Sequence, residues 1–188
     1  MGTGAAFASP YVVYTTYYSA PQWRRYIIRY SITIPDSLPQ LRLQPVPAPR
    51  SVLQPALQPG GISEEESRMV KLVNEERAKV GLAPLVIDSR LVELARKKSA
   101  DMIKNGYFSH ISPTYGSPFD MMKAAGISYR MAGENIAGAP SVDRAHVALM
   151  NSPGHRANIL NPNFTHIGIG IVDGGPYGKM FTQMFVQK

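Results

Sequence analysis

Apolar residues recur at helical spacing through the first half of the region that follows residue 62. A helix is predicted to begin at Ser63, because Glu66 lies three residues later and the two residues form a capping box. Gly81 suits the end of this helix, and Pro84 follows it. The predicted apolar face consists of Met69, Val70, Val73 and Val80. The pattern therefore indicates an amphipathic helix packed on a core.

Three more helices are predicted from the same signals. The second begins at Asp88 and ends at Gly106, the third is a short helix opened by residues 117–118, and the fourth begins at Ser141. The second helix repeats apolar residues at Leu91, Leu94, Ala95, Met102 and Ile103. Its charged run, Arg96 to Lys98, is predicted to be a solvated face.

The apolar period changes from helical to alternating near the C-terminus. Residues 167–172 alternate with glycine, residues 173–176 are a Gly-rich turn cluster, and residues 180–186 are apolar on both faces. Neighbouring strands joined by such a turn are expected to pair antiparallel. A strand that is apolar on both sides is covered on both sides. The sequence therefore predicts an α+β fold with helices on both faces of a small sheet.

Residues 1–62 differ in character from the rest of the chain, since they hold nine of its sixteen prolines. We predict a Tyr-rich arm at residues 1–34 with a β-hairpin, a Pro-rich linker at 35–62 and a globular domain at 63–188. The arm is interpreted as packed on the domain, as disordered, or as a wall- or membrane-contacting module that uses Trp23 and three arginines. Residues 6–8 match the A-x-A end of a signal peptide, although no intact signal peptide precedes them.

Composition narrows the classes of function without selecting one. The chain has no cysteine, which excludes disulfides, thiol catalysis and zinc fingers. No run of 18 or more apolar residues occurs, so no transmembrane helix is predicted. The net charge of +7 permits attraction to anionic polymers. The positive charge is diffuse and no nucleic-acid recognition motif accompanies it, so specific nucleic-acid binding is not expected.

Three segments predicted as turns between helices hold the residues best suited to chemistry. They contain His110, Glu134 with Asn135, and Ser152 with His155. Two imidazoles and a carboxylate could form a divalent-metal site with open positions. Their spacing matches no local ligand motif, and scattered histidines usually cap or pack. A serine nucleophile would lack the G-x-S-x-G elbow, and Glu134 has no convincing second acid for glycoside hydrolysis.

Five segments, taken together and in order, resemble the CAP superfamily of cysteine-rich secretory, antigen 5 and pathogenesis-related 1 proteins. The chain is most similar to the bacterial, cysteine-free SCP-like branch, and the resemblance covers about residues 66–188. The segments are Val73-Asn-Glu-Glu-Arg77, Phe108-Ser-His110, Gly133-Glu-Asn-Ile-Ala137, residues 152–160 and Ile167-Gly-Ile-Gly170.

The resemblance implies a three-layer α-β-α sandwich with a central antiparallel sheet, and a cleft where histidines and acids converge. It places the two family histidines on His110 and His155, and the family glutamate on Glu134. Many family members carry a second glutamate shortly before the last histidine, and Ser152 replaces it here. The resemblance thus implies a reduced cleft of His110, Glu134 and His155 that binds Zn²⁺ or another divalent cation. Asn135 and Ser109 are candidates to support it. The alternative interpretation is that Glu134 mainly hydrogen-bonds His110 or His155 and joins the loops, since a buried carboxylate–imidazole pair is structurally plausible by itself.

The resemblance implies an exported bacterial protein more firmly than it implies a particular catalysed reaction, because proteins that share one fold can have many different functions. Our first hypothesis is a non-catalytic or metal-modulated binding protein of the cell envelope or spore. Its partners would be an anionic wall polymer, a lipid or an envelope protein. The alternatives are a metal-dependent hydrolase, such as a protease, in which Glu134 is the candidate catalytic residue, and a scaffold that self-associates through the arm.

Overall fold

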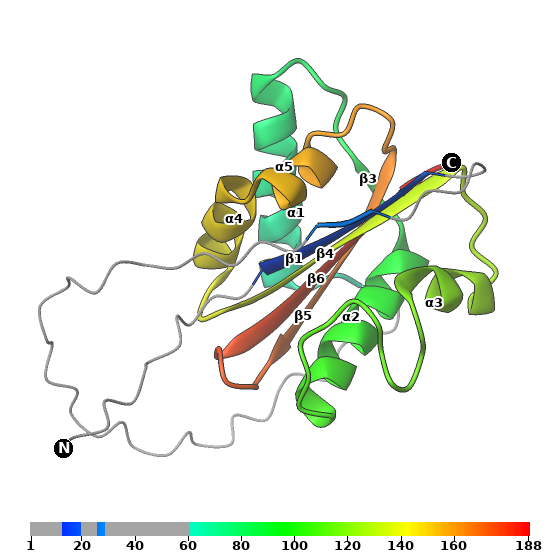
Figure 1. Cartoon of the computed structure of the whole chain (residues 1–188). Helices are drawn as coiled ribbons and strands as arrows, with labels where there is room; N and C mark the ends of the chain where they lie inside the picture. The colour runs from blue at the N-terminus through cyan, green and yellow to red at the C-terminus, as the bar shows by residue number, and fades with distance from the viewer. Residues whose placement is uncertain (1–12, 20–25, 29–60) are drawn as a thin grey trace, which may run out of the picture.

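The computed structural model describes residues 13–19, 26–28 and 61–188. They form one six-stranded sheet in the order β2-β1-β4-β6-β5-β3, with helices on both sides (Figure 1). The strands are β1 (Val13–Ser19), β2 (Tyr26–Ile28), β3 (Val86–Ile87), β4 (Met131–Ala139), β5 (His166–Asp173) and β6 (Lys179–Gln187).

Four of the helices begin where the sequence predicted. Ser63, Asp88, Ser117 and Ser141 are their N-caps, and each side chain accepts a hydrogen bond from a backbone N–H in the first turn. The helices are α1 (Glu64–Lys79), α2 (Ser89–Lys104), α3 (Pro118–Ala124) and α4 (Val142–Asn151), followed by α5 (Pro153–Ile159), which was not predicted. Val80 was assigned to the buried face of the first helix, but it lies beyond α1 and is exposed.

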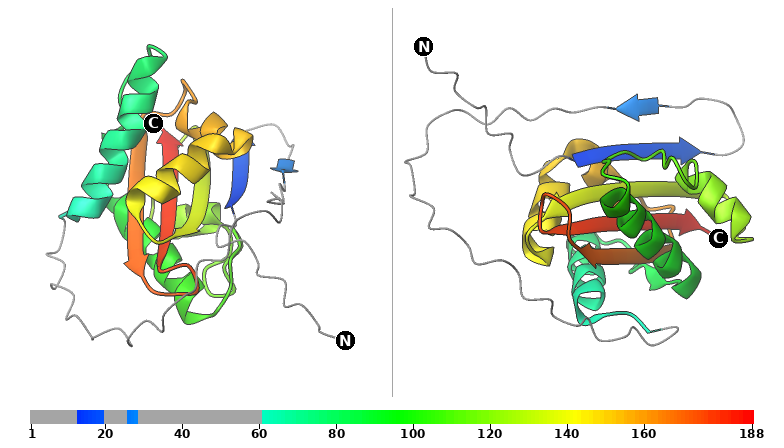
Figure 2. Two further views of the ribbon diagram at one scale, coloured as in Figure 1. Left: turned by 90° about the vertical axis from the view of Figure 1, so that its left-hand side faces the viewer. Right: turned by 90° about the horizontal axis from the view of Figure 1, so that it is seen from below.

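The helices form two layers around the sheet, as Figures 1 and 2 show from three directions. On one face, α1, α4 and α5 cover an apolar cluster that includes Met69, Leu149 and Phe185. On the other face, α2 and α3 cover clusters that include Leu91 and Met184. The predicted α+β sandwich is confirmed, and the pairs among β1, β4, β6 and β5 are all antiparallel. The two-residue strand β3 departs from this pattern, since it pairs parallel with β5.

The C-terminal hairpin is confirmed in detail. Strands β5 and β6 pair antiparallel from His166↔Val186 to Asp173↔Lys179. The turn between them contains Gly174, Gly175 and Gly178, all with positive φ, which suits glycine. Nearly all of β6 is buried, as expected for a central strand that is apolar on both faces.

Two segments that the sequence predicted as turns are regular elements. The Gly133-Glu-Asn segment lies within β4, which pairs with β6 along its whole length. His155 lies on α5, which Pro153 opens at its first position. Glycine, alanine and asparagine are poor strand formers, so β4 forms because its neighbours pair with it rather than through its own propensity.

The N-terminal arm contributes two strands to the sheet. Strand β1 pairs antiparallel with β4 over seven positions, and β2 pairs with β1 at Thr15↔Ile28, Thr16↔Ile27 and Tyr17↔Tyr26. The side chains of both strands, and residues 35–60 of the predicted linker at 35–62, lie outside the described residues. The division of the chain at residues 34 and 62 stays a prediction.

Helix α2 lies unusually close to β5. A Cβ atom added at Gly170 would lie 2.1 Å from the carbonyl carbon of Ala95 and from the amide nitrogen of Arg96. A Cβ atom at Gly168 would lie 2.2 Å from the carbonyl carbon of Leu91. The alternating glycines of β5 therefore make room for the backbone of a helix, which explains the Ile-Gly-Ile-Gly sequence.

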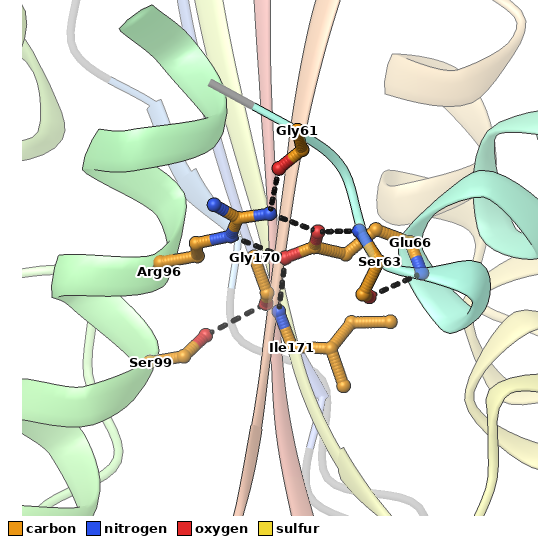
Figure 3. Close-up of polar contacts among 7 residues, drawn as sticks. All are labelled: Gly61, Ser63, Glu66, Arg96, Ser99, Gly170 and Ile171. Carbon is orange, nitrogen blue, oxygen red and sulfur yellow. Dashed lines mark hydrogen bonds and ion pairs between the residues drawn. The ribbon is translucent and has the colours of Figure 1, made fainter. Parts of the chain in front are cut away.

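A partly buried ion pair joins α1, α2 and β5 (Figure 3). Arg96 donates from Nε to Glu66 Oε1 at 2.7 Å and from a terminal nitrogen to Glu66 Oε2 at 2.5 Å. The same arginine donates to the carbonyl of Gly61, and the amide of Ile171 donates to Glu66 Oε1 at 3.4 Å. The prediction that Arg96 and Lys98 belong to a solvated face was wrong, because Arg96 pairs with this carboxylate and Lys98 is fully buried.

His146 on α4 gives the fold a pH dependence. Burial lowers the pKa of His146, and the Glu76 carboxylate, 3.9 Å from its Nε2, only partly offsets that effect. The folded state therefore binds this proton less readily than the unfolded state, whose value is near 6.5. The stability that the folded state gains from keeping His146 neutral is fully present above about pH 6.5. It is lost progressively as the pH falls below that value.

We expect the unfolding free energy of the wild type to decline between pH 7 and pH 5, with a limit of about 1.4 kcal/mol per pH unit for one proton. His146→Leu removes the titrating group, so its decline should be shallower in urea titrations at each pH. Some slope should persist, because burial also lowers the pKa of His166. An equal slope in wild type and variant would contradict this assignment.

Candidate functional site

Glu134 is placed by the alternation of β4. Ala132 and Ile136, on the same side of the strand, pack into the clusters under α2 and α3, whereas Ala137 packs under α1 and α4. The Glu134 side chain is fully buried, and its Oε1 lies 2.7 Å from Nδ1 of His110. The His110 side chain is 11% exposed, although its Nε2 atom is buried.

The second histidine is held by a different set of contacts. His155 Nδ1 lies 2.7 Å from Ser152 Oγ, and both side chains are buried. The amide of Asn135 donates to the carbonyl of His155 at 3.1 Å and to Gln183 Oε1 at 3.0 Å. Asn158 donates to Asn135 Oδ1 at 2.8 Å. Asn135 therefore links β4 to α5 and β6.

The structure thus places the predicted site residues in two separate groups. His110 pairs with Glu134, and His155 pairs with Ser152, while consecutive residues of β4 serve both groups. Ser109, predicted as a supporting residue, is exposed and accepts a hydrogen bond from the amide of Ile111. Its contact shapes the loop and does not touch the imidazole of His110.

The loop that carries His110 is fixed by residues that the sequence did not single out. Lys98 on α2 is fully buried and donates to the His110 carbonyl and to the Tyr107 hydroxyl, each at 3.1 Å. Burial lowers the pKa of Lys98, while the carboxylates of Glu134 and Asp101 act in the opposite direction. Lys98 follows Leu91, Leu94 and Ala95 by seven, four and three positions, so helical spacing alone places it on the buried face.

Asp101 anchors the same loop from the next turn of α2. Its carboxylate accepts hydrogen bonds from the hydroxyls of Tyr107, Ser112 and Thr114 at 2.5 to 2.7 Å. Burial alone would raise the pKa of Asp101, but these hydrogen bonds outweigh it and lower the pKa. Burial and the bond to Asp101 raise the pKa of the Tyr107 hydroxyl, which remains a donor at neutral pH. The His110 backbone is therefore held on a rigid support.

The residues predicted to hold a metal do not form a three-ligand set. Within residues 61–188, no group of three or more histidine and acidic side chains is placed to hold an ion. One oxygen of Glu134 is already bonded to His110, and His155 is bonded to Ser152. This arrangement does not fit a zinc site with three protein ligands. Zinc binding stays a prediction from the resemblance.

Residues 70–187 match the model of the cysteine-rich secretory protein family, CAP. The chain belongs to this family. Two bacterial relatives match about two thirds of the chain. The chain is 56% identical over 131 residues to the Bacillus subtilis protein YkwD, and 38% identical over 128 residues to the B. subtilis membrane protein YlbC. These matches span 69% and 65% of this chain, but only 50% and 34% of the relatives' own lengths.

Solved CAP structures have the same fold. An extracellular protein from Bacillus anthracis that contains an SCP domain is 37% identical, with a TM-score of 0.61 over 66% of this chain and 40% of that one. An outer surface protein from Borrelia burgdorferi is 22% identical, with a TM-score of 0.62 over 66% of this chain and 93% of that one. Among the described residues, no helix is long and apolar enough to cross a membrane.

Proposed function

We propose that this CAP protein is exported and acts at the bacterial cell envelope as a binding protein, with His110 and Glu134 at its point of recognition. Export is supported by the extracellular B. anthracis protein, which shares 37% of residues with this chain over the matched region. The observation that carries the binding role is a pair of buried polar atoms. Nε2 of His110 and Oε2 of Glu134 have no hydrogen-bond partner among the residues that the structure describes.

The chemistry of these two atoms defines what they would bind. An ionised carboxylate only accepts hydrogen bonds, so Nδ1 of His110 donates to Glu134 Oε1. In the neutral ring, Nε2 then accepts. With the ring neutral, both unpartnered atoms are acceptors, and leaving them buried and unsatisfied costs free energy. A ligand that brings two donors, such as neighbouring hydroxyl or amide groups, would satisfy them.

Wall polymers offer donors of this kind, because their glycan strands carry hydroxyl and amide groups. The net charge of +7 would also draw the protein to an anionic wall surface. Glu134 is the buried acid paired with His110, and the other buried carboxylate near it, Asp101, is engaged by three hydroxyl donors, so the site supports recognition better than hydrolysis. Lipids and envelope proteins are the other partners to be compared in the same assay.

Co-sedimentation with insoluble Bacillus peptidoglycan tests the proposal. We expect saturable binding by the full chain, weakened about tenfold or more by His110→Gln and by Glu134→Gln, since a hydrogen bond to a charged group contributes about 1.5–3 kcal/mol. His166→Gln, a histidine substitution on β5, serves as the matched control and should bind like the wild type. Circular dichroism of each variant shows whether the fold is retained.

Other outcomes of this assay would contradict the proposal. Equal binding by the wild type and both site variants would remove His110 and Glu134 from recognition. Release of soluble wall fragments by the wild type, but not by Glu134→Gln, would favour the hydrolase instead. In a separate titration, saturable Zn²⁺ binding that is lost in both His110→Ala and His155→Ala would show that the two histidines share a metal site, which would contradict direct recognition through a neutral His110.

A further inference from the structure

The outer edge of β4 is covered by a strand from far away in the sequence. Strand β1 lies along that edge in Figures 1 and 2, and seven consecutive residue pairs run from Val13↔Ala137 to Ser19↔Met131. At the centre of this register, Thr16 is opposite Glu134 and Thr15 is opposite Asn135. The backbone of β1 therefore runs directly beside the residues of the candidate site.

Strand β1 is an addition to the family domain. The family match begins at residue 70, and the sheet inside it consists of β4, β6, β5 and β3. In that smaller sheet β4 is an edge strand, paired with β6 on one side alone. An edge strand presents a row of backbone donors and acceptors that another extended segment can pair with. With β1 paired to it, eight of the nine β4 residues are buried.

The connection to β1 permits exchange. Thirty-two residues, 29–60, separate the end of β2 from residue 61, and such a length spans about 110 Å when fully extended. A tether of this length closes onto its own domain with an effective concentration far above that of a dilute second copy. Own-chain pairing is therefore favoured over pairing with a second copy.

We propose that the outer edge of β4 is a strand-binding site for extended polypeptide. Residues 13–19 of the same chain occupy this site and can be displaced from it by a competing segment. The recognition is mainly through the backbone, in the manner of strand addition to a sheet edge. A competing segment needs about seven residues of strand-forming type without proline at paired positions. Displacement would expose the backbone edge of β4 at Glu134, which pairs with Thr16. This inference concerns the strand edge and stands apart from wall-polymer binding.

A disulfide tests which chain supplies the strand. The wild type has no cysteine, so Ser19→Cys with Met131→Cys introduces a single possible pair at directly opposed positions. Opposed residues of antiparallel strands lie within the Cα range of a disulfide. Under mild oxidation the full-length double variant should form a monomeric disulfide. Tyr18→Cys with Met131→Cys is the matched control, because neighbouring strand residues point to opposite faces, and it should cross-link far less.

A peptide tests whether residues 13–19 can be displaced. The probe is a fluorescent synthetic peptide of residues 11–19 with two added lysines for solubility, measured by anisotropy. It should bind the reduced Ser19→Cys, Met131→Cys protein and lose at least tenfold in affinity once the disulfide locks β1 in place. A disulfide-linked dimer would assign the strand to a second copy and overturn own-chain pairing. Equal cross-linking in the control, or peptide binding unaffected by the lock, would overturn the edge site.

Discussion

Gly170→Ala is expected to destabilise the domain by at least about 3 kcal/mol, or to prevent its folding. The added Cβ would meet backbone atoms of Ala95 and Arg96 at 2.1 Å, and a backbone cannot rotate away as a side chain can. Helix α2 would have to move off the sheet. The effect should therefore reach His110, since α2 carries Lys98, which bonds to the His110 carbonyl.

Urea titration measures this effect, with the midpoint lowered and the slope unchanged if the variant still folds in two states. Gly106→Ala is the matched control, because Gly106 has a φ of +63° but no atom of the described residues within 4 Å of an added Cβ. That change imposes backbone strain alone and should cost about 1 kcal/mol. Similar losses in the two variants would show that the contact between α2 and β5 is not the cause.

Arg77→Lys is expected to cost about 3 kcal/mol or more despite the conserved charge. The guanidinium is 1% exposed, and its nitrogens donate to the carbonyls of Ala83, Ile159, Asn161 and Phe164 at 2.8 to 3.3 Å. One lysine ammonium cannot reach this spread of acceptors, so buried carbonyls would be left unsatisfied. The loop after α5, which leads into β5, would lose its attachment to α1.

The same substitution at an exposed position of α1 is the control for this prediction. Arg68 pairs with Asp143 at the surface, where both side chains are more than half exposed. Exposed ion pairs contribute little to stability, so Arg68→Lys should leave the unfolding midpoint unchanged. A midpoint for Arg77→Lys equal to that of Arg68→Lys would contradict the structural role given to the four carbonyls.

The elements with strong local signals could be predicted from the sequence. Caps at Ser63, Asp88, Ser117 and Ser141 fixed the starts of four helices, and the Gly-rich turn at 173–176 fixed the C-terminal hairpin. Strand β4 could not be predicted, because its glycines, alanines and Asn135 have weak strand preference and its pairing partners come from residues 13–19 and 179–187. Its structure is decided by long-range pairing.

The site was predictable in its residue types but not in its arrangement. Family motifs led to His110, Glu134 and His155, yet nothing local shows that His110 bonds to Glu134 whereas His155 bonds to Ser152. Lys98 was predicted to be solvated because a run of three cations usually lies at the surface. Its helical spacing from Leu94 and Ala95 instead indicated the buried face, where the structure places it. Charge pattern and apolar spacing disagreed there, and the spacing was the better guide.

The central claim is that Nε2 of His110, buried and without a hydrogen-bond partner among the described residues, is the acceptor that receives the ligand. Nitrogen-15 NMR of the histidine side chains tests it on the full chain, with and without soluble peptidoglycan fragments. We predict that His110 is the neutral tautomer with its hydrogen on Nδ1, and that its Nε2 signal shifts on addition of fragments in the wild type but not in Glu134→Gln. Fragment binding that leaves the Nε2 signal unmoved, or no fragment binding at all, would contradict the account.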